Sequence, residues 1–322
     1  MKNCNEWGQL KKVIVGKAEQ AKMPSVDLSV RTVNHADITD PSYIRQGVYP
    51  QKVIQEATED LEIFCDFLKS NGVEVFRPEE TDPFYYNYCP RDSVFVYDDE
   101  SYATPMPIRC RQKEYTAFEK YLKNLRVIET YNDDDLYNPN CIGNPNILAL
   151  NEVAPSFDAA NIIRANDDIL YLVSNSGNKK GAELLQELLD SKARVHTLEN
   201  VYSYMHIDST IAFLRDGLLL ANPKRIKDKN YLPKPFCDWE IIWCPEPYDI
   251  GHYPNMCNAS EWINMNLFSI NHNLVVLEEH QHNLRKELEK KGIDCAMLPM
   301  RHQRTLGGGF HCVTLDTERE IQ

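Results

Sequence analysis

The sequence predicts an α/β protein built from several similar units rather than from one doubly wound sheet. Segments with strand periodicity alternate with helical segments along the whole chain. The order hairpin, helix, strand also recurs, most clearly where a hairpin at 267–277 precedes a helix at 283–291 and a strand at 293–298. The letters themselves do not repeat, but a recurring unit of this kind is typical of folds that reuse one structural motif.

The elements follow in order from the N-terminus. A short strand at 11–15 precedes a long helix at 51–70, whose apolar residues recur every three or four positions and whose C-terminal cap is Asn71 with Gly72. Further strands are predicted at 73–76, 93–97, 169–173 and 194–198, and further helices at 112–123 and 181–191. Asp216 and Gly217 lie between two apolar runs and predict a tight hairpin over 211–221.

The composition is that of an ordinary globular protein. Of the 322 residues, 43% are hydrophobic and 26% are charged, so the chain can bury a core without disulfides or metals. No linker rich in Pro, Gly or Ser divides it, and the turn-rich stretch 131–143 is predicted to be a surface loop. We therefore expect residues 1–322 to form a single domain.

Charge and hydropathy disfavour several function classes. The net charge is −13 and no long basic cluster is present, so nucleic acid is not an expected partner. No apolar run approaches the roughly 18 residues of a membrane span, and the N-terminus lacks a signal sequence. These features predict a cytoplasmic protein without a membrane partner. No glycine-rich phosphate loop is present, so a nucleotide cofactor is not expected.

Ten cysteines are scattered through predicted core segments, and none has CxxC spacing. A zinc site is therefore not expected, and most of the cysteines are predicted to be reduced packing residues. His280 and His282 flank Gln281 and could form a metal pair, but capping or surface roles fit better just before a helix. No metal is expected.

One cysteine has a different context. Cys312 follows Gly307, Gly308 and Gly309 closely, and glycines allow the backbone to approach a ligand. A cysteine after such a loop can lie where a substrate reaches it. A flexible turn followed by a buried packing cysteine explains this segment equally well when it is considered alone.

Four further polar residues lie in unusual settings. His206 and Asp208 alternate on a segment predicted to be extended, so their side chains share one face. Asp158 lies among small apolar residues, where a buried carboxylate needs a partner, either a cationic substrate or an arginine such as Arg164. Asp92 precedes an apolar strand and is either an ordinary strand-start residue or a second carboxylate for a cation.

Together, a cysteine, a histidine and several aspartates without metal-binding spacing suit one type of chemistry. Carboxylates hold a planar guanidinium through paired hydrogen bonds. A thiolate can then add to the guanidinium carbon while a histidine protonates the departing amine.

In sequence order, these segments resemble the arginine-dependent amidinotransferases, which include glycine amidinotransferase and the inosamine-phosphate amidinotransferases. Each motif is weak alone, but the ordered set is specific, and Gly-Gly-Gly-Phe-His-Cys after His-x-Asp separates this family from the arginine deiminases. The resemblance covers Asn87 to the C-terminus, and the part before Asn87 matches more loosely. The motifs are Pro90-Arg91-Asp92, Phe157-Asp158-Ala159-Ala160, His206-Ile207-Asp208, Asn222-Pro223 with Arg225, Met265-Asn266 and Gly307-Gly308-Gly309-Phe310-His311-Cys312.

The resemblance implies the pentein fold, a five-bladed α/β propeller of ββαβ-type units around a central active site, without cofactor or metal. It implies that Cys312 is the nucleophile, His206 the acid and base, and Asp158 the residue that orients His206 and contacts the guanidinium. The remaining implied roles concern substrate binding: Asp92 and Asp208 bind the guanidinium, Arg225 pairs with the substrate α-carboxylate, and Ser260 assists it.

Two positions bear on the finer details. Residue 161 is Asn, where glycine amidinotransferase has Asp, but the catalytic carboxylate aligns with Asp158, so the difference affects only supporting contacts. In this family the residues just before His206, here Ser203, Tyr204 and Met205, help to shape the acceptor pocket. They leave the acceptor open.

The implied reaction uses L-arginine and an amine. Cys312 attacks the guanidinium carbon, L-ornithine leaves, and the acceptor amine takes the amidino group from the cysteine. The cationic substrate and a protonated His206 would favour the thiolate. Glycine is the first choice of acceptor because it is the commonest in the family, and since family members are often dimers, a homodimer is compatible with the resemblance.

Two alternatives stay open. A guanidine hydrolase of the arginine deiminase or dihydrolase type would use water in place of the amine. An inactive arginine-binding protein on the same fold is disfavoured, because a binder has no need of Cys312.

Overall fold

Three-stranded sheets with one shared pattern form the framework of the computed structural model, which describes residues 3–19, 21–79, 86–202 and 204–320. In this part of the chain there are five such sheets, and each joins an antiparallel pair to an outer parallel strand. Four are continuous in sequence: β5–β7 (Val94–Tyr97, Glu100–Ala103, Leu125–Val127), β8–β10 (Ile162–Ala165, Asp168–Leu172, Arg194–Leu198), β11–β13 (Ile211–Arg215, Leu218–Ala221, Glu240–Trp243) and β14–β16 (Phe268–Asn271, Leu274–Glu278, Asp294–Leu298).

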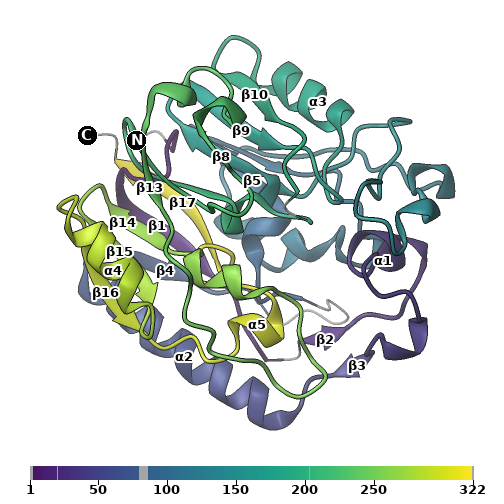
Figure 1. Cartoon of the computed structure of the whole chain (residues 1–322), viewed down its shortest axis with the longest axis horizontal. Coiled ribbons are helices and arrows are strands. Elements are labelled where there is room, and N and C mark those ends of the chain that lie inside the picture. The colour runs from purple at the N-terminus through teal and green to yellow at the C-terminus, as the bar shows by residue number, and fades with distance from the viewer. Residues whose placement is uncertain (1–2, 20, 80–85, 203, 321–322) are drawn as a thin grey trace.

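The fifth sheet joins the two ends of the chain. β1 (Gln9–Val15) pairs with β17 (Thr314–Glu320) in antiparallel register and with β4 (Glu74–Phe76) in parallel register. Figure 1 shows β1 and β17, at opposite ends of the colour scale, side by side, with both termini at the same edge of the molecule. This pairing closes the ring of five sheets and confirms the predicted fold class.

Helices connect the second and third strands in three of the five sheets, and they lie on the outside (Figure 1). α2 (Gln51–Ser70) buries the predicted apolar stripe, including Leu61 and Phe64, and stops where Gly72 adopts a left-handed φ of +75°. α3 (Lys179–Leu189) begins at Asn178, whose side chain accepts a hydrogen bond from the Gly181 amide. α4 is His282–Glu289. The remaining elements are α1 (Leu28–Val33), α5 (Gln303–Leu306) and a small sheet of β2 (Lys22–Met23) and β3 (Gly47–Val48).

The helix predicted at 112–123 is wrong. Three 3-10 turns, Arg109–Arg111, Glu114–Ala117 and Glu119–Tyr121, occupy this connection instead. Tertiary contacts explain the difference, because the Ala117 carbonyl accepts a hydrogen bond from the Glu79 amide and the buried Arg111 side chain donates to Asp92. The predicted hairpins over 211–221 and 267–277 are confirmed, and Gly217 has the positive φ of a tight turn.

The centre of the ring contains buried ion pairs as well as apolar residues. Asp316 on β17 accepts hydrogen bonds from Arg91 (2.8 Å), Arg164 (2.6 Å) and Arg319 (2.7 Å). Arg164 also binds Glu6 at 2.8 Å, so it is not the partner of Asp158 that the sequence allowed. The contacts tie both chain ends to the central sheets, and Arg91 also donates to the carbonyl of His311, the residue before Cys312.

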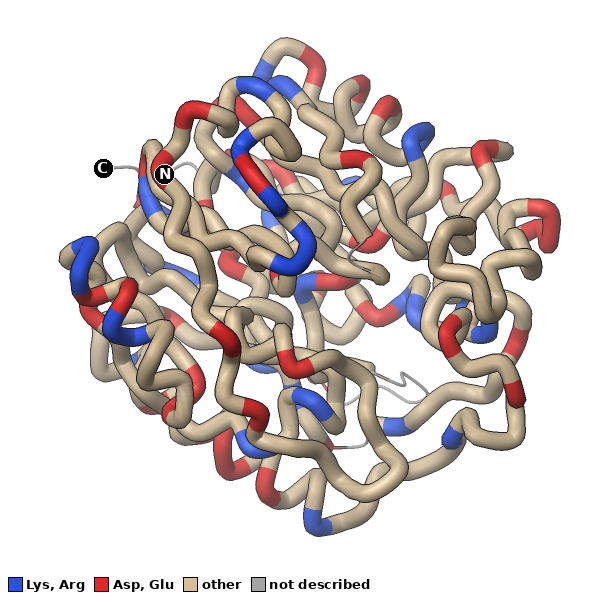
Figure 2. Tube along the Cα trace, in the orientation of Figure 1, with Lys and Arg blue, Asp and Glu red and all other residues tan. Residues whose placement is uncertain are grey.

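The surface has the mixed charge and the exposed loop that the composition and the sequence pattern predict. The stretch 131–143 is mostly exposed, as predicted, although Leu136 and Tyr137 anchor it in the core. Basic and acidic positions are interspersed over the face drawn in Figure 2. In the part of the chain that the structure describes, no helix is long and apolar enough to cross a membrane.

Candidate active site

A cavity of about 530 Å³ opens at the centre of the ring. Its walls come from segments far apart in sequence, including the N-terminal stretch around β2 and β3 and the segments before β5, β11 and β17. Of the residues predicted from sequence, Asp158 alone does not line it, because this fully buried side chain reaches the site through His206. The others do line it: Cys312, His206, Asp92, Asp208, Arg225, Ser260 and Met205.

The glycine segment places Cys312 at the cavity floor. α5 ends at Gly307, which has a left-handed φ of +80°. A Cβ on Gly309 would lie 2.8 Å from the Asn266 side chain, so this close approach requires glycine. Asn266 in turn holds the nucleophile segment: its Oδ1 accepts hydrogen bonds from the amides of His311 (2.9 Å) and Cys312 (3.2 Å), and its Nδ2 lies 3.2 Å from the Cys312 Sγ.

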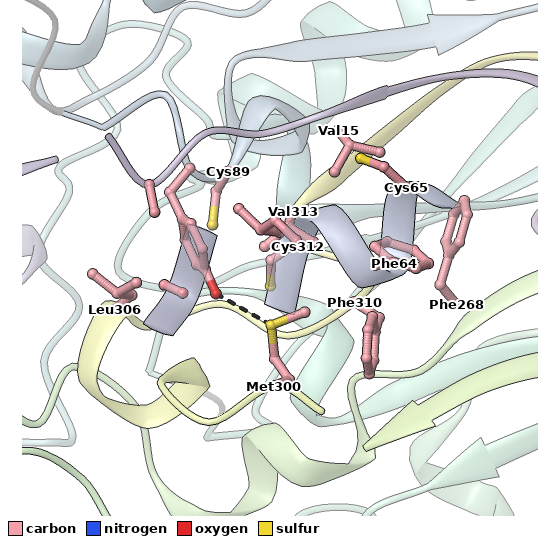
Figure 3. Packing of buried hydrophobic residues seen from close by; sticks show 14 of the residues in the cluster. Val15, Phe64, Cys65, Cys89, Phe268, Met300, Leu306, Phe310, Cys312 and Val313 are labelled. Carbon is pink, nitrogen blue, oxygen red and sulfur yellow. Dashed lines mark hydrogen bonds between the residues drawn. The ribbon is translucent and has the colours of Figure 1, made fainter. Parts of the chain in front are cut away.

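The Cys312 thiol is buried and has two further polar partners. Its Sγ lies 3.0 Å from Oδ2 of Asp208, and it shares a hydrogen bond with the thiol of Cys89. Figure 3 shows both cysteines within the same buried cluster. The hydrogen bond with Cys89, burial and the negative charge of Asp208 raise the pKa of Cys312 well above its usual range. In this site the residue is therefore a thiol, and a thiolate would require additional positive charge nearby.

Cys89 was expected to be a packing residue, and its contact with the nucleophile leads to a testable consequence. Replacing Cys89 with Ala removes the largest contribution that holds the pKa of Cys312 high. We expect iodoacetamide to alkylate Cys312 up to about tenfold faster at neutral pH, since the reaction rate follows the thiolate fraction. Peptide mass spectrometry against time gives the rate at Cys312 specifically.

Cys65→Ala is the matched control, because Cys65 is a buried thiol of the same cluster. It should leave the labelling rate of Cys312 unchanged. Equal rates in the Cys89→Ala variant and the unmodified protein would show that Cys89 does not set the state of the nucleophile.

His206 lies between two carboxylates. Its Nε2 is 2.9 Å from Oδ2 of Asp158, and its Nδ1 is 3.9 Å from Oδ1 of Asp92. Burial alone would lower the pKa of His206, but the charge of Asp92 and the hydrogen bond and charge of Asp158 raise it to about 9. The imidazole is therefore protonated at neutral pH and can act as an acid.

The predicted extended segment at His206 and Asp208 is only partly correct. His206 has extended backbone angles, but Ile207–Ser209 forms a 3-10 turn. Both side chains nevertheless line the same cavity. Asp208 is also held by His311, whose Nδ1 lies 3.2 Å from the same Oδ2, and although burial opposes this, the contact with His311 keeps the pKa of Asp208 well below its usual range.

Two buried carboxylate oxygens have no hydrogen-bond partner among the described residues. They are Oδ1 of Asp92 and Oδ1 of Asp158. In each residue the other oxygen is occupied, by Arg111 in Asp92 and by His206 in Asp158. Unsatisfied buried acceptors are costly. Because Asp92 lines the cavity, its free oxygen indicates a site there for a ligand with hydrogen-bond donors and positive charge.

The predicted carboxylate-binding residue lies farther along the cavity wall. Arg225 donates from Nη1 to the Ser209 carbonyl (3.1 Å) and to the hydroxyls of Ser209 (2.8 Å) and Thr210 (2.8 Å). Burial lowers the pKa of Arg225 to about 10, so it remains a cation at neutral pH. Ser260 begins the 3-10 turn Glu261–Met265 and also lines the cavity.

Hydrogen bonds from buried side chains hold the segment before His206 in place. The Met205 carbonyl accepts a hydrogen bond from the Ser174 hydroxyl, which itself accepts one from Asn161 at 3.2 Å. Asn161 thus acts as a buried support, in agreement with its expected supporting role. Tyr204 lines the cavity and binds the Ala36 amide through its hydroxyl, whereas Ser203 lies outside the described residues.

Sequence reasoning missed Arg111, Glu114, Cys89 and His311. Glu114 lies in the segment predicted to be a helix and Arg111 directly before it, so neither residue stood in a motif that indicated a site. His311 stands beside Cys312 in the motif and could have been suspected on that ground. No group of three or more His, Cys, Asp or Glu side chains in the described ranges is arranged to hold a metal, and His280 instead pairs with Glu278 at 2.7 Å.

Known proteins resemble the chain over nearly all its length. No family model matches it. Inosamine-phosphate amidinotransferase 1 of Streptomyces glaucescens is 38% identical over 98% of this chain and 95% of its own. The mitochondrial glycine amidinotransferase of Xenopus tropicalis is 31% identical over 98% of this chain and 82% of its own.

A solved structure of an amidinotransferase also resembles this chain. The inosamine-phosphate amidinotransferase of Streptomyces griseus superposes with a TM-score of 0.94 and 36% identity, over 100% of this chain and 97% of that one. The superposition spans the whole of this chain and therefore every sheet described above. The chain therefore belongs to the amidinotransferase family of transferases and has the pentein fold.

Proposed function

We propose that this protein transfers the amidino group of L-arginine to an amine through an amidino-Cys312 intermediate and releases L-ornithine. The observation that carries the proposal is the free oxygen of Asp92 at the cavity, beside a protonated histidine and a buried thiol. Carboxylate oxygens complement the N–H groups of a planar guanidinium. A cation bound there also supplies positive charge close to Cys312, which favours the thiolate over the thiol.

The steps follow from these positions. When the guanidinium binds, Cys312 releases its proton to solvent and its sulfur forms a bond with the guanidinium carbon. His206 donates a proton to the nitrogen of the breaking carbon–nitrogen bond, and ornithine leaves as a neutral amine that solvent then protonates. The acceptor amine gives a proton to His206 as its nitrogen attacks the same carbon. The sulfur departs as a thiolate, which regains a proton, so the cycle balances.

Arg225 is the proposed partner of the arginine α-carboxylate. The Arg225→Gln variant should raise KM for arginine about 10- to 100-fold while kcat changes little, because a charged hydrogen bond to a remote part of the substrate is lost. Decarboxylated arginine (agmatine) lacks this carboxylate. It should be a poor substrate for the unmodified protein and should lose nothing further in the variant.

Lys224→Gln is the matched control, because Lys224 is the neighbouring cation and pairs with Glu246 at the surface. Steady-state kinetics with both substrates checks the assignment. An Arg225→Gln variant that loses arginine and agmatine activity equally would place the substrate carboxylate elsewhere.

The acceptor is proposed to be a primary amine, with glycine as the first candidate and a phosphorylated aminocyclitol as the second. The second rests on the cavity: its volume suits a ligand larger than glycine, and Lys22 and Arg45 line it together with Arg225. Two of the relatives act, by name, on inosamine phosphate and on glycine.

A transfer assay tests the proposal. The protein is incubated with arginine labelled at the guanidino carbon and with glycine, lysine, an aminocyclitol and its phosphate in competition. Unlabelled ornithine together with a labelled new guanidine supports amidino transfer and identifies the acceptor. Labelled citrulline, or ornithine with labelled urea and no new guanidine, would mean that water is the acceptor and that the protein is a hydrolase.

A further inference from the structure

Arg111 lies at the edge of the cavity and is enclosed by acidic and aromatic groups. Its Nη1 donates to Oδ2 of Asp92 at 2.9 Å, and its Nε and Nη2 donate to the Glu114 carboxylate at 3.0 and 2.8 Å. The guanidinium carbon also lies 4.9 Å from the centre of the Tyr86 ring. The Arg111 and Glu114 side chains are both buried, so the clamp between them is fixed rather than a transient surface pair.

The clamp determines how Asp92 meets a ligand. Because Arg111 occupies Oδ2, the unpartnered Oδ1 is the oxygen that stays available, and it lies 3.9 Å from Nδ1 of His206. In Asp158, similarly, His206 occupies Oδ2 and Oδ1 has no partner. Rotation of the Asp92 carboxylate would exchange its two oxygens, and Arg111 is the group that opposes this rotation.

Arg111 also supplies charge. Three carboxylates, from Asp92, Asp158 and Glu114, lie close to it in the site, and His206 is the other nearby cation. Burial raises the pKa of Asp158, while His206 and Arg111 counteract this and the charge of Asp92 adds to it. Burial likewise raises the pKa of Glu114 to about 7. Loss of Arg111 would therefore favour a proton on Asp158, which would weaken a guanidinium site.

We propose that Arg111, clamped by Glu114, is a positioning residue that presents Oδ1 of Asp92 to the guanidinium of the donor. This role rests on the proposed function, because it assumes a guanidinium substrate. It is separate from that function, because Arg111 itself makes no bond to the reacting atoms. The ion pair of Arg111 and Glu114 is thus part of the donor site and not only of the core.

Arginine binding by calorimetry tests this role, in a Cys312→Ser background so that turnover does not interfere. The Arg111→Gln/Glu114→Gln variant removes one charge of each sign, so neither Arg111 nor Glu114 is left as an unpaired buried ion, whereas Asp92 loses the partner of its Oδ2. We expect it to bind arginine about 10- to 100-fold more weakly near neutral pH. The deficit should shrink as pH rises, because deprotonation of Asp158 restores the site. A purely structural role of Arg111 would not produce that pH dependence.

Two further variants complete the series. Glu114→Gln keeps Arg111 but loosens its clamp, and we expect binding about 3- to 10-fold weaker. Arg126→Gln is the control, because Arg126 lies on β7, the strand that follows the Arg111 connection, and its exposed side chain pairs with Glu100 outside the cavity. Arginine binding should be unchanged in this variant. Thermal unfolding of each variant confirms that it folds.

The outcomes separate the two proposals. A graded loss across the series with the expected pH dependence supports the role of Arg111. Equal affinity at every pH in Glu114→Gln, in the double variant and in the control would overturn it, and Glu114→Gln decides alone if the double variant does not fold. Absence of arginine binding in the protein with an unmodified Arg111 would count against the proposed function itself.

Discussion

Replacement of Cys312 with alanine should reduce turnover about 10⁴-fold or more while the protein stays folded. In the proposed mechanism the sulfur is the only atom that carries the amidino group between donor and acceptor, and removal of a nucleophile of this kind has effects of that size. The fold should survive because one small side chain is lost from a segment that Asn266 holds mainly through backbone amides. Product formation and thermal unfolding measure the two effects separately.

Two comparisons sharpen this prediction. Cys237→Ala removes a partly buried cysteine that packs in another cluster, remote from the cavity, and should leave turnover unchanged. The Cys312→Ala variant should still bind arginine, because Asp92 and Asp158 remain in place. Turnover retained in this variant would rule out covalent catalysis through Cys312.

Replacement of His206 with glutamine should lower the rate of ornithine formation about 10²- to 10⁴-fold, the usual contribution of a positioned acid. The pKa of His206 is about 9. Its acidic form is therefore fully present at neutral pH and is lost as pH rises through about 9. The unmodified protein should show a decline in single-turnover ornithine formation over that range, and the variant should lack this decline.

His196→Gln is the control for this experiment. His196 lies on β10 and also contacts a carboxylate, Asp168, at 2.7 Å, but it is not part of the cavity. Its rate and pH profile should match those of the unmodified protein. An unchanged high-pH decline in the His206→Gln variant would assign the acid to another group.

Local patterns explain why much of the fold was predictable. The hairpin around Gly217 and the long helix at 51–70 depend on turn chemistry and on the spacing of apolar residues, which are written in adjacent letters. The segment at 112–123 has helical spacing as well. It folds differently because long-range contacts outweigh its local preference: the Glu79 amide donates to the Ala117 carbonyl, and Arg111, just before the segment, donates to Asp92.

In the candidate site, too, local motifs were predictable from the sequence and long-range side-chain contacts were not. The predicted reactive residues, among them Cys312 and His206, lie in short motifs with unusual residue combinations, and the cavity brings them together. The occupied and free oxygens of Asp92 and the contact of Cys89 with the nucleophile depend on side-chain geometry across the ring of sheets. The pattern of letters carries no such geometry, and Cys89 in particular looks like one more packing cysteine.

The most direct test of the central claim is to trap the intermediate. The protein is mixed with arginine labelled at the guanidino carbon without any added acceptor amine and is quenched with acid, and its peptides are analysed by mass spectrometry. We expect the label on the peptide that contains Cys312, and we expect an added acceptor amine to release it as a labelled guanidine. Ornithine formation without label on Cys312, or release of the label only to water, would contradict amidino transfer through this residue.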